Sequence, residues 1–140
     1  MEYITQQNSV ILAVSAGNVD IANSDAIMYA KKVDPQQERT LMVVTKLDLA
    51  TDDMTDVLSG KAHPIKLGII GVINRSQRDI AEGVSHEDIL AKESKILKQK
   101  YPAIAQHHGT PFLRLKLNNV LMQHIKKCCP SLDVRKRTVI

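Results

Sequence analysis

Two short polar clusters in this chain carry side chains that could read a nucleotide base. The first is Thr45-Lys46-Leu47-Asp48, directly after the apolar run TLMVV. The carboxylate of Asp48 can accept hydrogen bonds from both N–H groups on the Watson–Crick edge of guanine, whereas adenine has no such pair of donors. Lys46 can lay its methylene stem over the base face while its ammonium group reaches the ribose oxygen. This cluster therefore predicts selective binding of guanine.

The second cluster is Asn74-Arg75-Ser76-Gln77, which follows the apolar run GIIGVI. Its backbone N–H groups can donate to guanine O6, and the Arg75 side chain can cover the base. Either cluster alone is a weak signal, because an exposed polar loop after a strand has the same composition. The two clusters together favour a base-binding site over two unrelated loops.

The surrounding pattern predicts the elements that must position these clusters. Short, continuous apolar runs predict buried strands, and helical spacing with capping residues predicts helices between them. Strands that are apolar along their whole length and alternate with helices are typical of a parallel sheet covered on both faces. Ligands of such sheets bind beyond the carboxyl ends of the strands, where both clusters lie. The predicted strands are 9–14, 40–44 and 68–73. Four helices are predicted: the first begins at Asn23 or Ser24 and ends at about residue 32, and the others cover 51–58, 85–100 and 110–128.

Composition limits the class of protein without deciding its function. The chain has 140 residues, 44% hydrophobic and 24% charged, as is usual for a globular domain. The net charge of +4 is mild and spread along the chain, so it is only a weak signal of an anionic partner, and no nucleic-acid partner is expected. There is no apolar run long enough to span a membrane and no secretory signal. The adjacent Cys128 and Cys129 lack the spacing of a zinc site, and the pair His107-His108 is interpreted as part of a loop with no third metal ligand.

Three longer segments resemble consecutive parts of the GTPase domain of dynamins. They are SVILAVSAGNVDIANSDAI, AKKVDPQQERTLMVVTKLDL and PIKLGIIGVINRSQRDI. The segments KLGIIGVINRSQ, KYPAIAQHHGTPFL and LMQHIKKCCP are most similar to the fission-type dynamin-related proteins that divide mitochondria and peroxisomes. The resemblance implies a partial P-loop-GTPase-like α/β fold with a three-stranded parallel sheet. It also implies that Thr45, Lys46 and Asp48, with Asn74, Arg75 and Gln77, bind the guanine base and ribose of GTP or GDP.

The sequence departs from the dynamin pattern at two places. After Asp48 the segment LATDDMTDVL lacks the glycine of the family's loop, and either Asp52 or Asp53 could replace the acid of that loop, which helps to pair two GTPase heads. A phosphate-binding loop needs GxxxxGK(S/T), yet the only Gly-Lys pair is Gly60-Lys61, and a DxxG element is missing too. We therefore expect residues 1–132 to form the guanine-binding half of a dynamin-type GTPase domain, followed by a basic tail at 133–140. This half should not hydrolyse GTP alone, and Mg²⁺ is expected only in the complete domain.

Three hypotheses for the function follow from this resemblance. The chain is part of a fission-type dynamin GTPase, or a short non-catalytic protein that docks on full-length dynamin relatives, or the product of a decayed gene copy. The first hypothesis implies a cytoplasmic protein at the surface of mitochondria or peroxisomes. Its contact with the membrane would be indirect, through the parent assembly, and the family analogy also admits microtubule binding.

Overall fold

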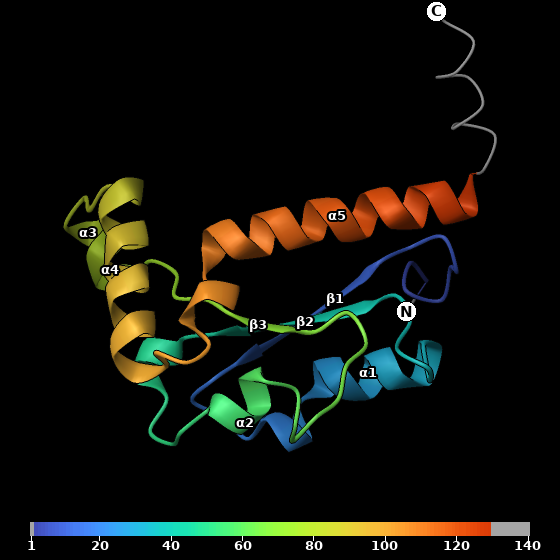
Figure 1. Ribbon diagram of the computed structural model, residues 1–140, viewed down its shortest axis with the longest axis horizontal. Helices are drawn as coiled ribbons and strands as arrows, with labels where there is room; N and C mark the ends of the chain where they lie inside the picture. The colour runs from blue at the N-terminus through green and yellow to red at the C-terminus, as the bar shows by residue number, and fades with distance from the viewer. Residues whose placement is uncertain (1, 130–140) are drawn as a thin grey trace, which may run out of the picture.

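The core of the molecule is a parallel sheet of three strands. The computed structural model describes residues 2–129 of the chain. The strands are β1 (Ile11–Ala16), β2 (Thr40–Thr45) and β3 (Ile69–Gly71), in the spatial order β1-β2-β3. All three run in the same direction, from right to left in Figure 1. The predicted α/β fold with a three-stranded parallel sheet is therefore confirmed.

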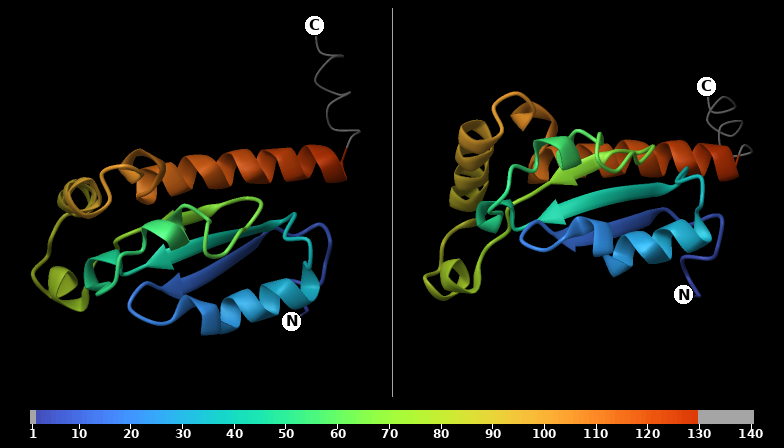
Figure 2. Two further views of the ribbon diagram at one scale, coloured as in Figure 1. Left: turned by 60° about the horizontal axis from the view of Figure 1, so that its bottom comes forward. Right: turned by 90° about the horizontal axis from the view of Figure 1, so that it is seen from below.

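Helices cover both faces of this sheet, as the sequence predicted. In Figure 2 the long helix α5 lies over one face, and α1 and α2 lie over the other. Among the residues that the structure describes, no helix is both long and apolar enough to cross a membrane. The α-helices are α1 (Asp25–Val33), α2 (Thr55–Leu58), α3 (Gln77–Ala81), α4 (His86–Lys100) and α5 (Thr110–Cys128), and the 3₁₀ helices are η1 (Ile21–Asn23), η2 (Leu47–Leu49) and η3 (Ala105–His107).

The central strand β2 supplies the core on both faces of the sheet. Leu41 and Val43 pack towards α5, in one cluster with residues of β3. Met42 and Val44 point the other way, into the cluster that includes Ile27 of α1. A fully buried aliphatic side chain of this kind stabilises the fold by roughly 1.5–3 kcal/mol. Burial on both faces explains why β2 is apolar along its whole length instead of alternating.

Strand β1 is less buried than the sequence suggested. Ile11 and Ala13 pack against α1, but Leu12 and Val14 on the opposite face are 43% and 49% exposed. The expectation of a buried strand is therefore wrong for the face that carries Leu12 and Val14. The physical reason is the position of β1 at the edge of the sheet, because α5 packs on residues of β2 and β3. The family order of strands also implies that this strand is an open edge with little cover, and that expectation is confirmed.

The helices differ from the predicted ones in three respects. The expected helix at 51–58 is only the single turn α2, because Asp53 accepts a hydrogen bond from the backbone N–H of Thr55 at 3.0 Å and starts the helix there. Helix α3 was not predicted at all. On α5, Leu113 and Leu117 pack against the sheet, whereas Leu121 and Ile125 further along the same row are exposed.

Candidate functional site

The two predicted base-reading clusters leave the sheet at the same end. Val44 of β2 pairs with Gly71 of β3 in parallel register, so both strands reach their carboxyl ends side by side. We call the segment after β2, residues 45–48, the TKLD loop, and the segment after β3, residues 74–77, the NRSQ loop. Figure 2 shows both segments at the carboxyl end of the sheet. This is the place where ligands of parallel α/β sheets bind.

The TKLD loop is shaped by an unusual backbone conformation at Lys46. Its φ and ψ angles of 56° and 38° lie in the left-handed region, which few residues other than glycine adopt. The turn sends Leu47 into the core, where it is completely buried, while Lys46 stays exposed and Asp48 half-buried. Left-handed backbone at a non-glycine residue costs on the order of 1 kcal/mol and persists where surrounding packing enforces it. Here the burial of Leu47 enforces it.

Thr45 ties the TKLD loop to the turn that follows β1. Its hydroxyl group lies 3.4 Å from the carbonyl oxygen of Ser15, and its own carbonyl oxygen accepts from the N–H of Gly17 at 2.7 Å. The loop then closes on itself, because Leu49 N–H donates to the Lys46 carbonyl at 3.0 Å. Thr45 thus anchors the loop on which Lys46 and Asp48 are carried.

The NRSQ loop runs from an exposed turn directly into α3. Ser76 caps this helix: its hydroxyl oxygen accepts from the N–H of Asp79 at 3.1 Å, and the Asp79 carboxylate accepts from the N–H of Ser76 at 2.8 Å. The Ser76 side chain and backbone, with a smaller contribution from Lys92, lower the pKa of Asp79 to about 2. Asn74, Arg75 and Gln77 are all exposed. The cap therefore fixes the backbone of the loop and leaves these three side chains free to meet a ligand.

The outer edge of β3 is closed by residues that the sequence did not identify. The N–H of Gly71 donates to Nδ1 of the buried His108 at 3.0 Å, and the carbonyl oxygen of Gly71 accepts from the N–H of Gly109 at 2.8 Å. His108 was interpreted above as a loop residue. Together with Gly109 it makes the hydrogen bonds to Gly71 that a neighbouring strand would otherwise make. Within residues 2–129, no three side chains of His, Cys, Asp or Glu are grouped so that they could hold a metal ion.

We expect stability to fall in mild acid because of His108. Burial is the main cause, and the neighbouring His107 the second, of a pKa of His108 lowered to about 4 in the folded chain. In the unfolded chain the pKa of a histidine is about 6.5. The unfolded state therefore binds more protons between these values, so the free energy of unfolding decreases as pH falls from about 6.5 to 4. The loss should be on the order of 2–3 kcal/mol. Urea unfolding at several pH values measures it.

The matched variants for this measurement are His108→Gln and His107→Gln. The first keeps an acceptor beside Gly71 without titrating and should lose this part of the pH dependence. The second removes only the smaller cause of the lowered pKa and should keep most of the pH dependence. An identical pH slope in wild type and His108→Gln would show that another group is responsible.

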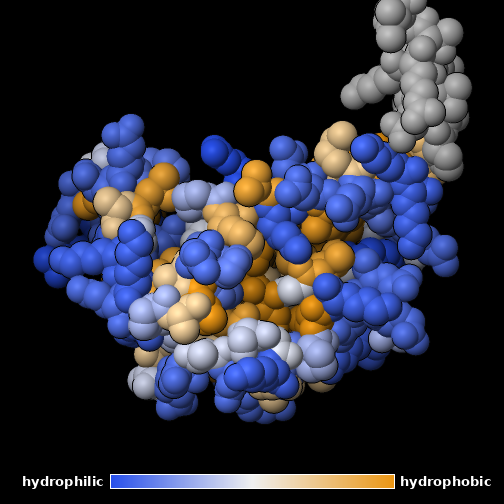
Figure 3. All heavy atoms as spheres, viewed as in Figure 1, coloured by the Kyte–Doolittle hydropathy of each residue, from blue (hydrophilic) through white to orange (hydrophobic). Residues whose placement is uncertain are grey.

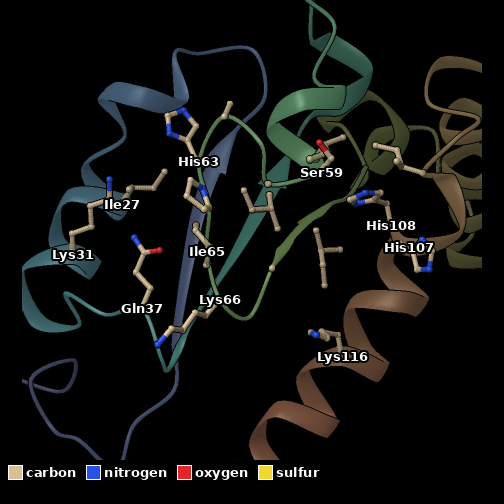
Figure 4. Close-up of a pocket in the computed structure, with 18 of the residues that line it drawn as sticks. Ile27, Lys31, Gln37, Ser59, His63, Ile65, Lys66, His107, His108 and Lys116 are labelled. Atoms are coloured by element: carbon tan, nitrogen blue, oxygen red, sulfur yellow. The ribbon is translucent and has the colours of Figure 1, made fainter.

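A groove of about 860 Å³ lies elsewhere, along β3 between the segment 59–68 and α5. Figure 3 shows it as an apolar hollow with a hydrophilic rim, and Figure 4 shows Lys116 of α5 across from His63 and Ile65. Ile69 and Ile70 are among the residues that line it, and none of the six predicted base-reading residues is. The two predicted base-reading loops therefore lie outside this hollow.

Comparison with known protein families identifies the class of this chain. The family model described as "Dynamin family" matches residues 1–47, and the model described as "Dynamin central region" matches residues 53–139. The second match covers more than half of the chain. The chain belongs to the dynamin family, and the resemblance seen in its sequence is confirmed.

Individual relatives agree with this assignment. A dynamin-1-like protein of Danio rerio is 50% identical over 137 residues, which are 96% of this chain and 20% of the relative. The dynamin-1-like protein drp-1 of Caenorhabditis elegans is 47% identical over 95% of this chain and 19% of its own length. The vacuolar protein sorting-associated protein 1 of Schizosaccharomyces pombe is 43% identical over 96% of this chain and 20% of its own length. The chain spans about a fifth of the length of these relatives.

Proposed function

We propose that the TKLD and NRSQ loops form the guanine-reading part of a nucleotide site. The observation that carries this proposal is the left-handed turn at Lys46, which buries Leu47 and leaves Lys46 exposed and Asp48 half-buried. The loop after β3 leaves the sheet at the same end, because β2 and β3 are parallel neighbours. Strained backbone that tertiary packing enforces is concentrated at functional sites. A flexible polar loop without a binding role would not require this strained conformation at Lys46.

Each loop has a distinct task in this site. Asp48 accepts from N1–H and the 2-amino group of guanine, and Lys46 covers one face of the base and reaches the ribose. In the NRSQ loop the backbone donates to O6, while Asn74, Arg75 and Gln77 complete the pocket wall. Thr45 holds the first loop in place through its bonds to the turn after β1. We infer that residues 1–132 contribute this base-binding half of a dynamin-type GTPase domain.

The wider role follows from the fission-type dynamins that the chain resembles. We infer a cytoplasmic protein recruited to mitochondrial or peroxisomal membranes, where GTP hydrolysis drives membrane fission in the complete assembly. We expect Mg²⁺ only in the complete GTPase domain, because the sequence here has no phosphate-binding loop and no DxxG element. No chemical step is therefore assigned to this segment, and its contribution is selection of the base.

The purified chain is expected to bind guanine nucleotides without turning them over. Saturation-transfer NMR on GDP and ADP should show contacts to guanine that Asp48→Ala removes, and phosphate release from GTP with Mg²⁺ should equal the blank. Lack of any preference for guanine over adenine would reject the site. Turnover that disappears in Asp48→Ala would instead show that the chain hydrolyses GTP, contrary to the missing phosphate-binding elements.

The second candidate function, docking on a relative without catalysis, is favoured by the exposed apolar face of β1. An edge strand with exposed Leu12 and Val14 is a template for association with another chain. We expect the isolated chain to self-associate, and light scattering over a concentration series measures this. Val14→Lys places a charge on that face and should reduce association, whereas Lys32→Ala on the exposed surface of α1 should not. A wild-type chain that remains monomeric contradicts this expectation.

A further inference from the structure

One face of helix α4 contacts the TKLD loop and the residue that precedes the NRSQ loop. Ile89, Glu93 and Leu97 are its buried residues, spaced four apart, and Lys100 follows one turn later on the same side. Glu93 and Lys100 differ by seven positions, which places them about 10.5 Å apart along a helix axis. The carboxyl group of Glu93 meets a backbone N–H just before the NRSQ loop, and the amino group of Lys100 meets carbonyl oxygens of the TKLD loop and η2.

Glu93 holds the backbone from which the NRSQ loop begins. Its side chain is only 1% exposed, and its Oε1 atom accepts from the N–H of Ile73 at 2.8 Å. Thr110 at the start of α5 supplies the other donors, its N–H to Oε2 at 2.8 Å and its hydroxyl to Oε1 at 3.0 Å. Because Ile73 directly precedes Asn74, these bonds decide where the NRSQ loop leaves the sheet.

Lys100 holds the backbone of the TKLD loop and the short helix η2. Its ammonium nitrogen lies 3.3 Å from the carbonyl oxygen of Asp48, 3.4 Å from that of Ala50 and 3.5 Å from that of Leu47. The last carbonyl groups of a helix lack partners within the helix and carry partial negative charge, which an ammonium group stabilises. The main chain of the proposed base reader, Asp48, is therefore fixed from α4.

We propose that α4 sets the spacing between the two base-reading loops, with Glu93 and Lys100 as positioning residues. Guanine is rigid, so Asp48 must meet the amino edge while the NRSQ backbone meets O6 at the same time. A shift of one loop lengthens the hydrogen bonds to the part of guanine that this loop meets, either the amino edge or O6. The hydrogen bonds made by the other loop stay unchanged. This inference rests on the proposed guanine site and adds the residues that tune its selectivity.

Each positioning residue should control a different edge of the base. Inosine 5′-monophosphate lacks the 2-amino group, so its affinity relative to guanosine 5′-monophosphate reports the placement of Asp48. The 6-thio analogue of guanosine 5′-monophosphate replaces O6 by sulfur, a weak acceptor, so it reports the placement of the NRSQ loop. Lys100→Met should affect the first ratio, and Glu93→Gln, which puts an amide donor among N–H groups, should affect the second.

The experiment measures dissociation constants of the three nucleotides for the full 140-residue chain by ligand-observed NMR. We expect Lys100→Met to bring the inosine ratio about 3- to 10-fold closer to one and to leave the 6-thio ratio unchanged. Glu93→Gln should change the 6-thio ratio by a similar factor and spare the inosine ratio. Lys98→Met and Glu87→Gln alter exposed charges on α4 and serve as matched controls with wild-type ratios.

The outcomes separate this inference from the function on which it rests. A wild-type chain without preference for the guanine nucleotide over the inosine nucleotide overturns both. Guanine preference in wild type with unchanged ratios in the two variants overturns the positioning role alone, as does a uniform loss of affinity, which marks a purely structural role. If Glu93→Gln does not fold, the result for Lys100→Met decides, because that side chain lies at the surface.

Discussion

Replacing Asp48 by asparagine is expected to change the preferred base from guanine to xanthine. The aspartate carboxylate is an acceptor only, and guanine presents two donors to it, N1–H and the 2-amino group. Xanthine has a carbonyl oxygen in place of that amino group. Against Asp48 this oxygen would face a second acceptor, whereas the amide of asparagine offers one acceptor for N1–H and one donor for O2.

The effect should be large because the groups involved are directional and partly buried. Asp48 is half-buried, and a site that is built to hydrogen-bond one edge rejects the wrong edge by roughly 10⁴-fold or more. Lys46 and the NRSQ loop make their contacts with ribose, base face and O6, which guanine and xanthine share. The variant should therefore change which base is bound while leaving the remaining contacts intact.

The assay is competition between GTP and xanthosine triphosphate in a dynamin-family GTPase that carries this segment in place of its own. Asp52→Asn makes the same chemical change at an exposed carboxylate four positions away and should leave guanine preferred. A folded Asp48→Asn variant that still prefers guanine would falsify the assignment of Asp48 as the base reader.

The sequence predicted those elements whose signal is local. The continuous apolar run at 40–44 became β2 (Thr40–Thr45), and the capping residue Ser85 with the proline at 102 bounded α4 correctly. Helix α3 was missed although its signal was present, since Ser76 and Asp79 have the spacing of a capping box. The motif-based interpretation of Asn74–Gln77 as one loop hid the fact that Gln77 already belongs to a helix.

Features that depend on contacts between distant segments could not be predicted. Glu93 looks like an ordinary helix-surface acid in the sequence, and it is buried because the start of α5 and the end of β3 both turn their N–H groups towards it. His108 is buried for a related reason, since β3 needs an acceptor at its outer edge. The left-handed turn at Lys46 follows from the burial of Leu47 and has no counterpart in the local sequence.

The packing beneath the TKLD loop leaves no room for a side chain at Gly71. A Cβ atom at this position would lie 2.3 Å from Cδ1 of Leu47 and 3.0 Å from Cδ2 of Leu58. Gly71 is not among the glycines with positive φ, so the backbone itself would accept alanine and the conflict is purely steric. Leu47 is completely buried, so its side chain must shift within the core to admit the new methyl group.

We therefore expect Gly71→Ala to destabilise the fold and to weaken guanine binding together. Overpacking of this kind costs about 1–3 kcal/mol. Leu47 lies between Lys46 and Asp48, so its displacement moves both side chains that read the base. Urea unfolding gives the change in stability, and the NMR titration with GDP gives the change in affinity.

A second substitution at Leu47 tests whether this contact is the cause. Leu47→Val removes the Cδ1 atom that the new methyl group would strike, so the double variant should lose less stability than the sum of the two single changes. It should also regain part of the guanine affinity, because the loop can return towards its original path. Strictly additive losses in stability would mean that the methyl group at position 71 acts on some other neighbour, and that the link from β3 through Leu47 to the base reader is wrong.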